Sequence, residues 1–280
     1  MTVVRTAARR KRAPLATGAL IAVTVFSVFP LYWSFIMSTR DSSAIGDATP
    51  VLLPGGHLLE NLHEVFGKVD FWLALQNSLI VSCTVMVSNV VLSSLAGFAF
   101  ARLRFPGRDS LFLVVVGSMM VPAQLGVIPL YILVGDLGWD GRLEAVIVPG
   151  MVSAFSVFWM RQSCEESVLA ELFDAARSDG CSLPRVFWHV AVPALRPQAA
   201  VLAMLSFMTA WNDFFWPLVV LDPNESPTVQ VALSHLASGY YTDYALMLTG
   251  ATLGAVPVIA LFLLLSRQVV DGLMGGRFHV

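Results

Sequence analysis

The sequence predicts an all-α integral membrane protein with six transmembrane helices, on the evidence of composition, apolar run length and charge distribution. Hydrophobic residues make up 56% of the 280 residues and charged residues only 13%, which leaves too little polar surface to cover a soluble domain. The apolar runs approach 20 residues, the length that crosses a bilayer, whereas buried helices of soluble proteins have shorter runs. The formal net charge of −2 also disfavours a nucleic-acid partner.

Six uncharged apolar runs give the predicted spans in chain order. They cover residues 15–37, 77–101, 111–133, 145–160, 197–221 and 245–265. Strands are disfavoured because the runs lack the alternation of a barrel and because an open sheet leaves its backbone groups unsatisfied in lipid. Pro122 and Pro129 predict a kink in the third span. The fourth run is the shortest of the six.

Basic residues gather on one side of the predicted spans. Fourteen of the 17 lie before the first span or after the second, fourth and sixth: Arg5, Arg9, Arg10, Lys11, Arg12, Arg102, Arg104, Arg108, Arg161, Arg177, Arg185, Arg196, Arg267 and Arg277. Because such residues are retained on the inner side, we expect a multi-pass cell-membrane protein with both termini in the cytoplasm.

The predicted organisation is a basic N-terminal segment 1–14, a membrane domain 15–267 and a C-terminal tail 268–280. A cleaved signal peptide is the alternative for the first run, which is longer than a typical signal core and lacks a clear cleavage site. The connection 38–76 reads as a partly structured extracytoplasmic loop.

A polar segment, 165–196, separates the fourth and fifth spans and is too long for a simple helix connection. Its first half places Val168, Leu169, Leu172, Phe173 and Ala176 on one helical stripe, which predicts an amphipathic helix. Gly180 ends that helix. Ser182 and Pro184 begin a second short helix, predicted to run through Val190.

The amphipathic helix could lie flat on lipid or dock on a protein. A helix that lies on the inner leaflet normally carries basic residues on its polar face. From Glu165 to Asp179 the chain instead has five acidic residues and one basic residue, Arg177. That balance favours docking against a protein.

The spacing within this segment resembles the EAA loop of bacterial ABC importer permeases, which reads EAA, three residues, G, nine residues, I-x-LP. The matching residues are Asp174, Ala175, Ala176, Gly180, Val190, Val192 and Pro193. Aspartate replaces glutamate at the first position, and valine replaces isoleucine and leucine near the end. A shorter carboxylate at Asp174 would alter one contact.

The resemblance extends over nearly the whole chain. GFAFARLRFPGR at 97–108, VPAQLGVIPLY at 121–131 and the Trp211, Asn212, Asp213 triplet with the stretch that follows are similar to carbohydrate permeases. The C-terminal Gly272, Gly275 and Gly276 resemble the tail of the second of two paired permeases of the maltose type. Several short matches in the right order are more specific than any one of them.

The resemblance implies an importer-permease bundle in which 165–196 is a coupling helix held in a cleft of a cytoplasmic ATPase. It also implies the partners: a second related permease, a dimer of ATP-binding subunits and an extracytoplasmic solute-binding protein, with a sugar as substrate. The sequence has no G-x-x-x-x-G-K-[ST] phosphate loop, so ATP and Mg are expected on the partner ATPase. We expect no cofactor on this chain and no catalytic residues, since no catalytic constellation is visible.

Polar residues inside the predicted spans have two interpretations each. Asn212 and Asp213 either line the substrate path or gate, or fix helix packing, because a carboxylate in a bilayer is costly and faces the bundle interior. Gln124 offers the same choice, and Asn89 favours a hydrogen bond between helices. Trp211 and its aromatic neighbours either stack on a sugar or belong to the interfacial belt.

Three other classes of protein compete with an importer permease. A secondary transporter or channel needs ion-coupling acids or repeated halves, but Asp213 is the only clear intramembrane acid. An intramembrane enzyme needs paired catalytic groups, and a scaffold would not explain the loop spacing. The solute stays open: a sugar or oligosaccharide is expected, with polyols and glycerol phosphates as alternatives.

Overall fold

The computed structural model describes residues 14–45, 52–168, 170–236 and 243–273. Within them every regular element is a helix, which confirms the predicted all-α membrane fold. The predicted N-terminal segment up to residue 13, Leu169, Gly275 and Gly276 lie outside these residues. The helix that precedes the tail continues through residues 268–273.

The helices follow one another in this order: α1 Pro14–Ser38, η1 Ser42–Ile45, α2 Leu58–Lys68, α3 Phe71–Arg102, α4 Arg108–Ser118, η2 Ala123–Gly126, α5 Val127–Asp136, α6 Glu144–Gly150, α7 Ala154–Ser167, α8 Ala170–Ser178, α9 Leu183–Val186, η3 Phe187–Ala191, α10 Val192–Asn212, α11 Phe215–Val220, α12 Val229–Leu236 and α13 Tyr244–Leu273. The element η3 is one π-helical turn. All the others are α-helices except η1 and η2, which are short 3₁₀ turns.

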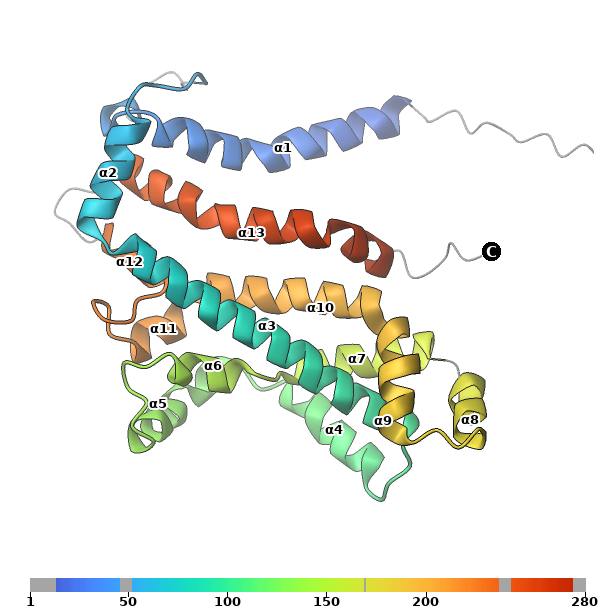
Figure 1. Ribbon diagram of the computed structural model, residues 1–280. Helices are drawn as coiled ribbons and strands as arrows, with labels where there is room; N and C mark the ends of the chain where they lie inside the picture. The colour runs from blue at the N-terminus through green and yellow to red at the C-terminus, as the bar shows by residue number, and fades with distance from the viewer. Residues whose placement is uncertain (1–13, 46–51, 169, 237–242, 274–280) are drawn as a thin grey trace, which may run out of the picture.

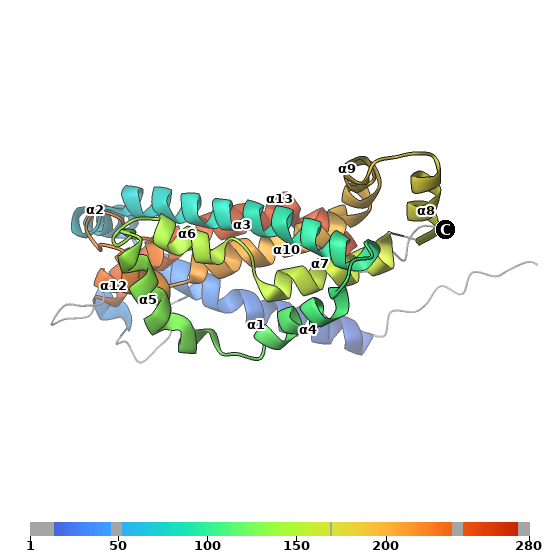
Figure 2. The same ribbon diagram turned by 90° about the horizontal axis from the view of Figure 1, so that it is seen from below.

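The long helices form a bundle in which α3 lies against α7 and α10, α10 against α13, and α13 against α1 (Figure 1). In both views α2, α5 and α12 lie at one end of this bundle and α8 and α9 at the other (Figure 2). The beginning of α1 and the end of α13 point to the end that carries α8 and α9. We call the end that carries α8 and α9 the hairpin end, and the end that carries α2, α5 and α12 the outer end.

Five helices in the described part of the chain are long and apolar enough to cross a membrane, and a bent pair adds a sixth candidate. The pair is α4 followed by η2 and α5, which turn by 94° at the break. Pro122 stands directly before η2, as the predicted kink required. A proline there removes a backbone donor and ends the helix.

Two predicted spans have the wrong boundaries. The fourth, predicted as 145–160, runs from Glu144 to Ser167 with a break at residues 151–153. The fifth, predicted as 197–221, ends at Asn212, and α11 is a separate helix. Its beginning is also earlier, because α9, the π turn and α10 form one continuous helical segment from Leu183 to Asn212. The short second helix predicted to stop at Val190 is therefore the start of a span.

Candidate functional site

The most distinctive feature of the hairpin end is the pair α8 and α9, joined by residues 179–182. This α8–α9 hairpin projects away from the bundle, as the view along the bottom makes plain (Figure 2). The motif singled out in the sequence begins in this hairpin and ends beyond it. Val190 lies in η3, and Val192 and Pro193 are the first residues of α10. Glu165 and Glu166, predicted as part of the same amphipathic helix, instead belong to the end of α7.

The corner of the hairpin is a hydrogen-bonded turn centred on Gly180, whose φ is +80°. Only glycine adopts that left-handed conformation without a steric cost. The Gly180 N–H donates to Arg177 O at 3.1 Å, and the Cys181 N–H donates to Ala176 O at 3.0 Å. These two bonds define a Schellman cap. Arg177 Nη1 also donates to Cys181 O at 2.8 Å, so the corner is held on both sides.

An apolar cluster beneath the hairpin joins it to the long helices. The buried members of this cluster are Phe98, Met160, Cys164, Val168, Val186, Phe187, Ala191, Leu195 and Leu202. The ring centroid of Phe98 on α3 lies 6.0 Å from that of Phe173 on α8 and 5.4 Å from that of Phe187. Closely packed interiors transmit displacement rather than absorb it, so a movement of α8 reaches α3 through these rings.

The seven residues of the predicted coupling motif divide between two surfaces. Three are partly buried against the apolar cluster: Ala176, Val190 and Val192. Three are exposed: Asp174, Ala175 and Pro193. The seventh, Gly180, is the corner. The motif therefore has exposed residues on α8 and at the start of α10, and apolar residues that pack against the bundle.

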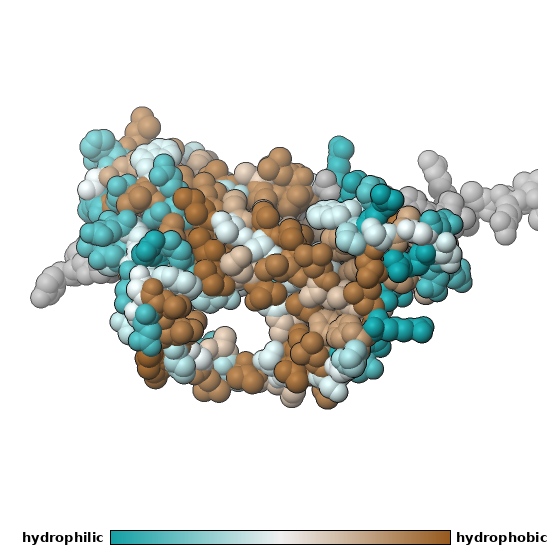
Figure 3. Space-filling model, turned by 60° about the horizontal axis from the view of Figure 1, so that its bottom comes forward, coloured by the Kyte–Doolittle hydropathy of each residue, from teal (hydrophilic) through white to brown (hydrophobic). Residues whose placement is uncertain are grey.

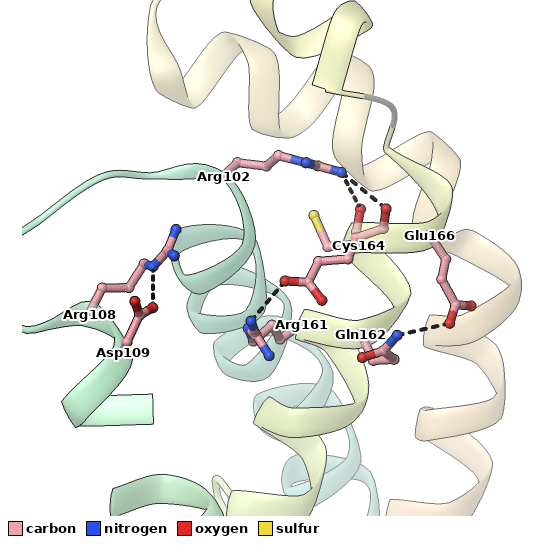
Figure 4. A network of polar contacts seen from close by, with 8 residues as sticks. Arg102, Arg108, Asp109, Arg161, Gln162, Cys164 and Glu166 are labelled. Atoms are coloured by element: carbon pink, nitrogen blue, oxygen red, sulfur yellow. Dashed lines mark hydrogen bonds and ion pairs between the residues drawn. The ribbon is translucent and has the colours of Figure 1, made fainter. Parts of the chain in front are cut away.

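Arg102, the last residue of α3, secures the end of α7 next to the hairpin (Figure 4). Its Nη2 group donates to Cys164 O at 3.1 Å, to Glu165 O at 3.2 Å and, at shorter range, to Val168 O. These carbonyls belong to the last turn and the C-cap of α7, where the helix no longer supplies every carbonyl with a partner; Cys164 O also accepts from the Val168 N–H at 3.1 Å. A guanidinium is suited to this position because it is always charged and carries several donors in one plane.

A second arginine connects α7 with α4. Arg161 forms an ion pair with Glu165 at 2.9 Å, and its Cζ atom lies 4.0 Å from the centroid of the Phe112 ring. Gln162 donates to Glu166 at 3.0 Å on the neighbouring face of α7 (Figure 4). The ends of α3, α4 and α7 are thus held together beside the hairpin.

The role of Arg102 and of Gly97 was not predicted from the sequence. Arg102 had counted only as one of the basic residues that set the orientation. A Cβ atom on Gly97 would lie 2.6 Å from Arg161 N and 2.6 Å from Met160 C, so α3 and α7 are in backbone contact there. Both residues lie in the stretch 97–108 that resembles carbohydrate permeases, which is the only sequence feature that could have drawn attention to them. Their partners on α7 are about 60 residues away in the chain, so the contacts could not be predicted.

The predicted gate residues do not lie together. Trp211 is 2% exposed and its Nε1 donates to Gly254 O at 3.1 Å, which places it between α10 and α13. Asn212 is exposed and donates to a carbonyl of its own helix, and Gln124 is exposed in η2. Asp213 follows the last residue of α10 and lines a cavity of about 390 Å³ between α3, the α6–α7 region and α10. The predicted bond of Asn89 to another helix is confirmed, because its Nδ2 donates to Gly150 O at 2.9 Å.

The side of the molecule formed by α4 and α5 is open. The space-filling view has a gap on this side, bordered by apolar side chains (Figure 3). Met120, Leu125 and Ile128 are exposed near the bend between the two helices. A surface of this kind meets lipid or another membrane chain. No group of three acidic, histidine or cysteine side chains that could hold a metal ion occurs in the part of the chain that the structure describes.

A family model for binding-protein-dependent transport system inner membrane components matches residues 89–274, which is well over half of the chain and includes the hairpin and all of the cavity lining except Val81 and Val85. The chain belongs to this family. It is an inner-membrane, multi-pass component of a transport system, as the resemblance implied.

This chain is similar to several transport system permease proteins over almost the full length of both sequences. It is 31% identical over 271 residues to the lactose transport system permease protein LacG of Rhizobium radiobacter, with 96% of this chain and 98% of the relative covered. It is 32% identical over 275 residues to the arabinooligosaccharides transport system permease protein AraQ of Halalkalibacterium halodurans, with the same coverage. It is 29% identical over 266 residues to the sn-glycerol-3-phosphate transport system permease protein UgpE of Escherichia coli, with 92% and 94% covered.

The fold is similar to a solved chain of a bacterial ABC transporter involved in the import of the acidic polysaccharide alginate. The TM-score is 0.76 over 95% of this chain and 99% of the other, at 21% identity. At this identity the likeness supports a shared fold.

Proposed function

We propose that this chain is a permease subunit of an ATP-driven, binding-protein-dependent sugar importer, and that the α8–α9 hairpin couples it to a partner ATPase. The observation that carries the proposal is the form of the hairpin. Its exposed face offers Asp174 and Ala175 outside the bundle, while its other face is packed on the apolar cluster. A fixed corner at Gly180 separates the two.

The hairpin is suited to act as a lever between two spans. On one side it follows α7, whose end is held by Arg102. On the other side it continues through the π turn into α10 without a break. A push on α8 therefore shifts α10 relative to α3 and α7, and such sliding of packed helices is a common form of conformational switching.

The charge of α8 favours a protein partner over lipid, while α9 carries one exposed basic residue, Arg185. Glu171, Asp174 and Asp179 are exposed on or directly after α8, where Arg177 is the basic residue. Anionic headgroups would repel this face, whereas a basic cleft on an ATP-binding subunit would attract it. The hairpin end and both termini would then be cytoplasmic, in agreement with the distribution of basic residues.

The remaining partners follow from the same proposal. ATP and Mg would be bound by a dimer of cytoplasmic ATPase subunits, since this chain has no phosphate-binding loop. A second permease would cover the open side near α4 and α5, and an extracytoplasmic binding protein would deliver the solute. A sugar or oligosaccharide is favoured because the relatives LacG and AraQ are named for such solutes.

The test is the ATPase activity of the complex in proteoliposomes with its binding protein, for Gly180→Pro and Asp174→Lys. Proline has φ near −65° and no N–H, so it removes the corner. Gly138→Pro is the matched control, because Gly138 also has a positive φ, +66°, and also donates its N–H three residues back. We expect ATPase stimulation and uptake to be lost in the two hairpin variants while the complex still assembles, and to persist in the control. Full stimulation and uptake in both hairpin variants would refute the coupling role.

A further inference from the structure

The cavity between α3, α6, α7 and α10 lies beside a break in a membrane-spanning segment. Helix α6 ends at Gly150 and α7 begins at Ala154, so residues 151–153 are not helical. The break faces Asn89, near the middle of the long helix α3. Irregular backbone at this depth is tolerated only where it is buried in protein or lines a polar cavity, and broken helices often mark the solute site of a transporter.

Asn89 lies beside this cavity and has a buried acceptor without a partner. The side chain is 5% exposed and lines the cavity. Its Nδ2 donates to Gly150 O at 2.9 Å, and because a carbonyl only accepts, the amide orientation is fixed. Its Oδ1 is buried without a hydrogen-bond partner. A buried acceptor of this kind costs free energy unless a donor is supplied. Because the Oδ1 atom has no accessible surface, Asn89 lines the cavity with its other atoms.

Hydroxyl groups lie on the other walls of the same cavity. Ser153 caps α7 by accepting from the Ser156 N–H at 3.1 Å, and the two hydroxyl oxygens are 2.6 Å apart. Ser206 and Thr209 line the wall formed by α10. Hydroxyl groups both donate and accept, so they match a solute that carries many hydroxyls. The volume of about 390 Å³ falls in the range of small-molecule sites, about 300–1,000 Å³.

The charge of the lining restricts the class of solute. Among the described residues that line the cavity, Asp213 is the only ionisable one, and none is basic. An anionic solute needs a cationic or donor-rich partner, and the Asp213 carboxylate would repel it. The remaining lining is apolar or neutral, as in sites for uncharged ligands.

We propose that this cavity is a transit site in which a neutral, polyhydroxylated solute is held by the hydroxyls of α10 and of the start of α7 and by the apolar wall. The inference rests on the proposed importer function and refines its substrate class, because it separates neutral sugars and polyols from phosphorylated or acidic ones.

The experiment uses the full complex in proteoliposomes with its binding protein. Uptake is measured for two neutral probes, lactose and an arabino-oligosaccharide, and for two anions, sn-glycerol 3-phosphate and an alginate oligosaccharide. We expect uptake of a neutral probe and of neither anion. Uptake of an anion, or ATPase stimulation without uptake of any neutral probe, overturns the assignment.

The contribution of the lining is measured in the double variant Ser206→Ala, Thr209→Val, which removes two hydroxyls and leaves the fold of α10 intact. Loss of one to two hydrogen bonds is expected to lower the solute carried per ATP hydrolysed by about 3- to 10-fold. Ser88→Ala is the control, because Ser88 donates to carbonyls of its own helix, at 2.7 and 3.1 Å, and does not line this cavity.

The ATPase readout distinguishes failure of the transit site from failure of the importer. If the double variant keeps binding-protein stimulation and loses solute per ATP, the site is supported. If it carries solute as the wild type does, the cavity is filled by lipid, water or a partner side chain, and the inference is wrong. If the wild-type complex itself shows no stimulation, the proposed function fails and the transit site with it.

Discussion

The two ends of the molecule each have an apolar cluster but differ in the polar contacts that accompany it. At the hairpin end, packing of apolar side chains joins α8, α9, α3 and α10, and one guanidinium secures the end of α7. At the outer end a separate apolar cluster, which includes Val65, Trp211 and Leu246, is accompanied by amide and hydroxyl side chains that bond to backbone groups of distant segments. Apolar contact has no preferred direction, whereas a hydrogen bond weakens steeply when its angle changes.

Several such side-chain to backbone hydrogen bonds lie at the outer end. Asn61 on α2 donates to Ser38 O at 2.9 Å and to Arg40 O at 2.8 Å. Asn77 on α3 donates to Pro227 O at 2.9 Å, and the next residue, Ser78, accepts from the Val229 N–H at 2.8 Å. These bonds fix the end of α1 with the residues that follow it, and the loop that precedes α12.

The difference assigns a separate mechanical role to each end. Packed rings can slide by small amounts and keep their contacts, so the hairpin end is suited to pass on movement. The side-chain to backbone hydrogen bonds of the outer end resist such sliding, so this end is suited to stay fixed. Substitutions that lower the stability of both ends equally test this difference. Transport should then change only when the substitution is at the hairpin end.

The largest effect is expected for Arg102→Leu compared with Asn61→Leu. Each change removes a side chain that donates to more than one backbone carbonyl, and leaves those carbonyls without that donor. We expect each to lower the free energy of unfolding by about 2–4 kcal/mol, measured as a lower Tm of the purified complex. Only Arg102→Leu should also abolish ATPase stimulation by the binding protein.

A further variant at the same site, Arg102→Lys, separates charge from geometry. A lysine ammonium keeps the charge but lacks the planar set of donors, so we expect only partial recovery of stimulation. Equal loss of stimulation in Asn61→Leu would contradict the division of roles between the two ends.

The second effect concerns two glycines at helix crossings. A Cβ on Gly97 would approach backbone atoms of α7 at 2.6 Å, whereas a Cβ on Gly250 would meet Leu233 Cδ2 at 2.3 Å, the end of a flexible side chain. Backbone cannot move aside as a side chain can. Gly97→Ala is therefore expected to cost about 1–3 kcal/mol and to separate α3 from α7.

For Gly250→Ala we expect a smaller change in Tm and no change in coupling, because Leu233 can adopt another rotamer. Thermal unfolding and ATPase stimulation of the two variants, measured side by side, check this. A larger loss of stability in Gly250→Ala would mean that the α12–α13 contact is the tighter one.

The membrane fold and the hairpin could be predicted from the sequence because both depend on local patterns. Run length identifies a span, and the interval between Asp174 and Pro193 identifies the loop. The end of the fifth span was missed because the chain stays apolar from Phe214 to Leu221. Hydropathy therefore cannot register that the helix ends at Asn212 and that Asp213 turns toward a cavity.

The candidate site was harder to predict because its partners are distant in sequence. Trp211 bonds to Gly254, 43 residues away, and Asn89 to Gly150, 61 residues away. Nothing in the local pattern of Trp211 separates a residue buried between helices from one in an aromatic belt. Likewise Arg102 reads as one more cytoplasmic charge until the end of α7 is placed beside it.

The smallest effect is expected for Phe112→Leu, which tests whether α4 belongs to the moving hairpin end. Leucine keeps the apolar contact but removes the ring on which the Arg161 guanidinium lies, an interaction of about 0.5–1 kcal/mol at such sites. The matched change at the outer end is Phe66→Leu, which removes the stacking of Phe66 on Trp72 at 5.6 Å. Both variants should show a similar, small fall in Tm. Solute carried per ATP should fall only in Phe112→Leu, because the Arg161 side chain then loses one of its two anchors beside the hairpin; if it falls in Phe66→Leu instead, the outer end is the one that moves.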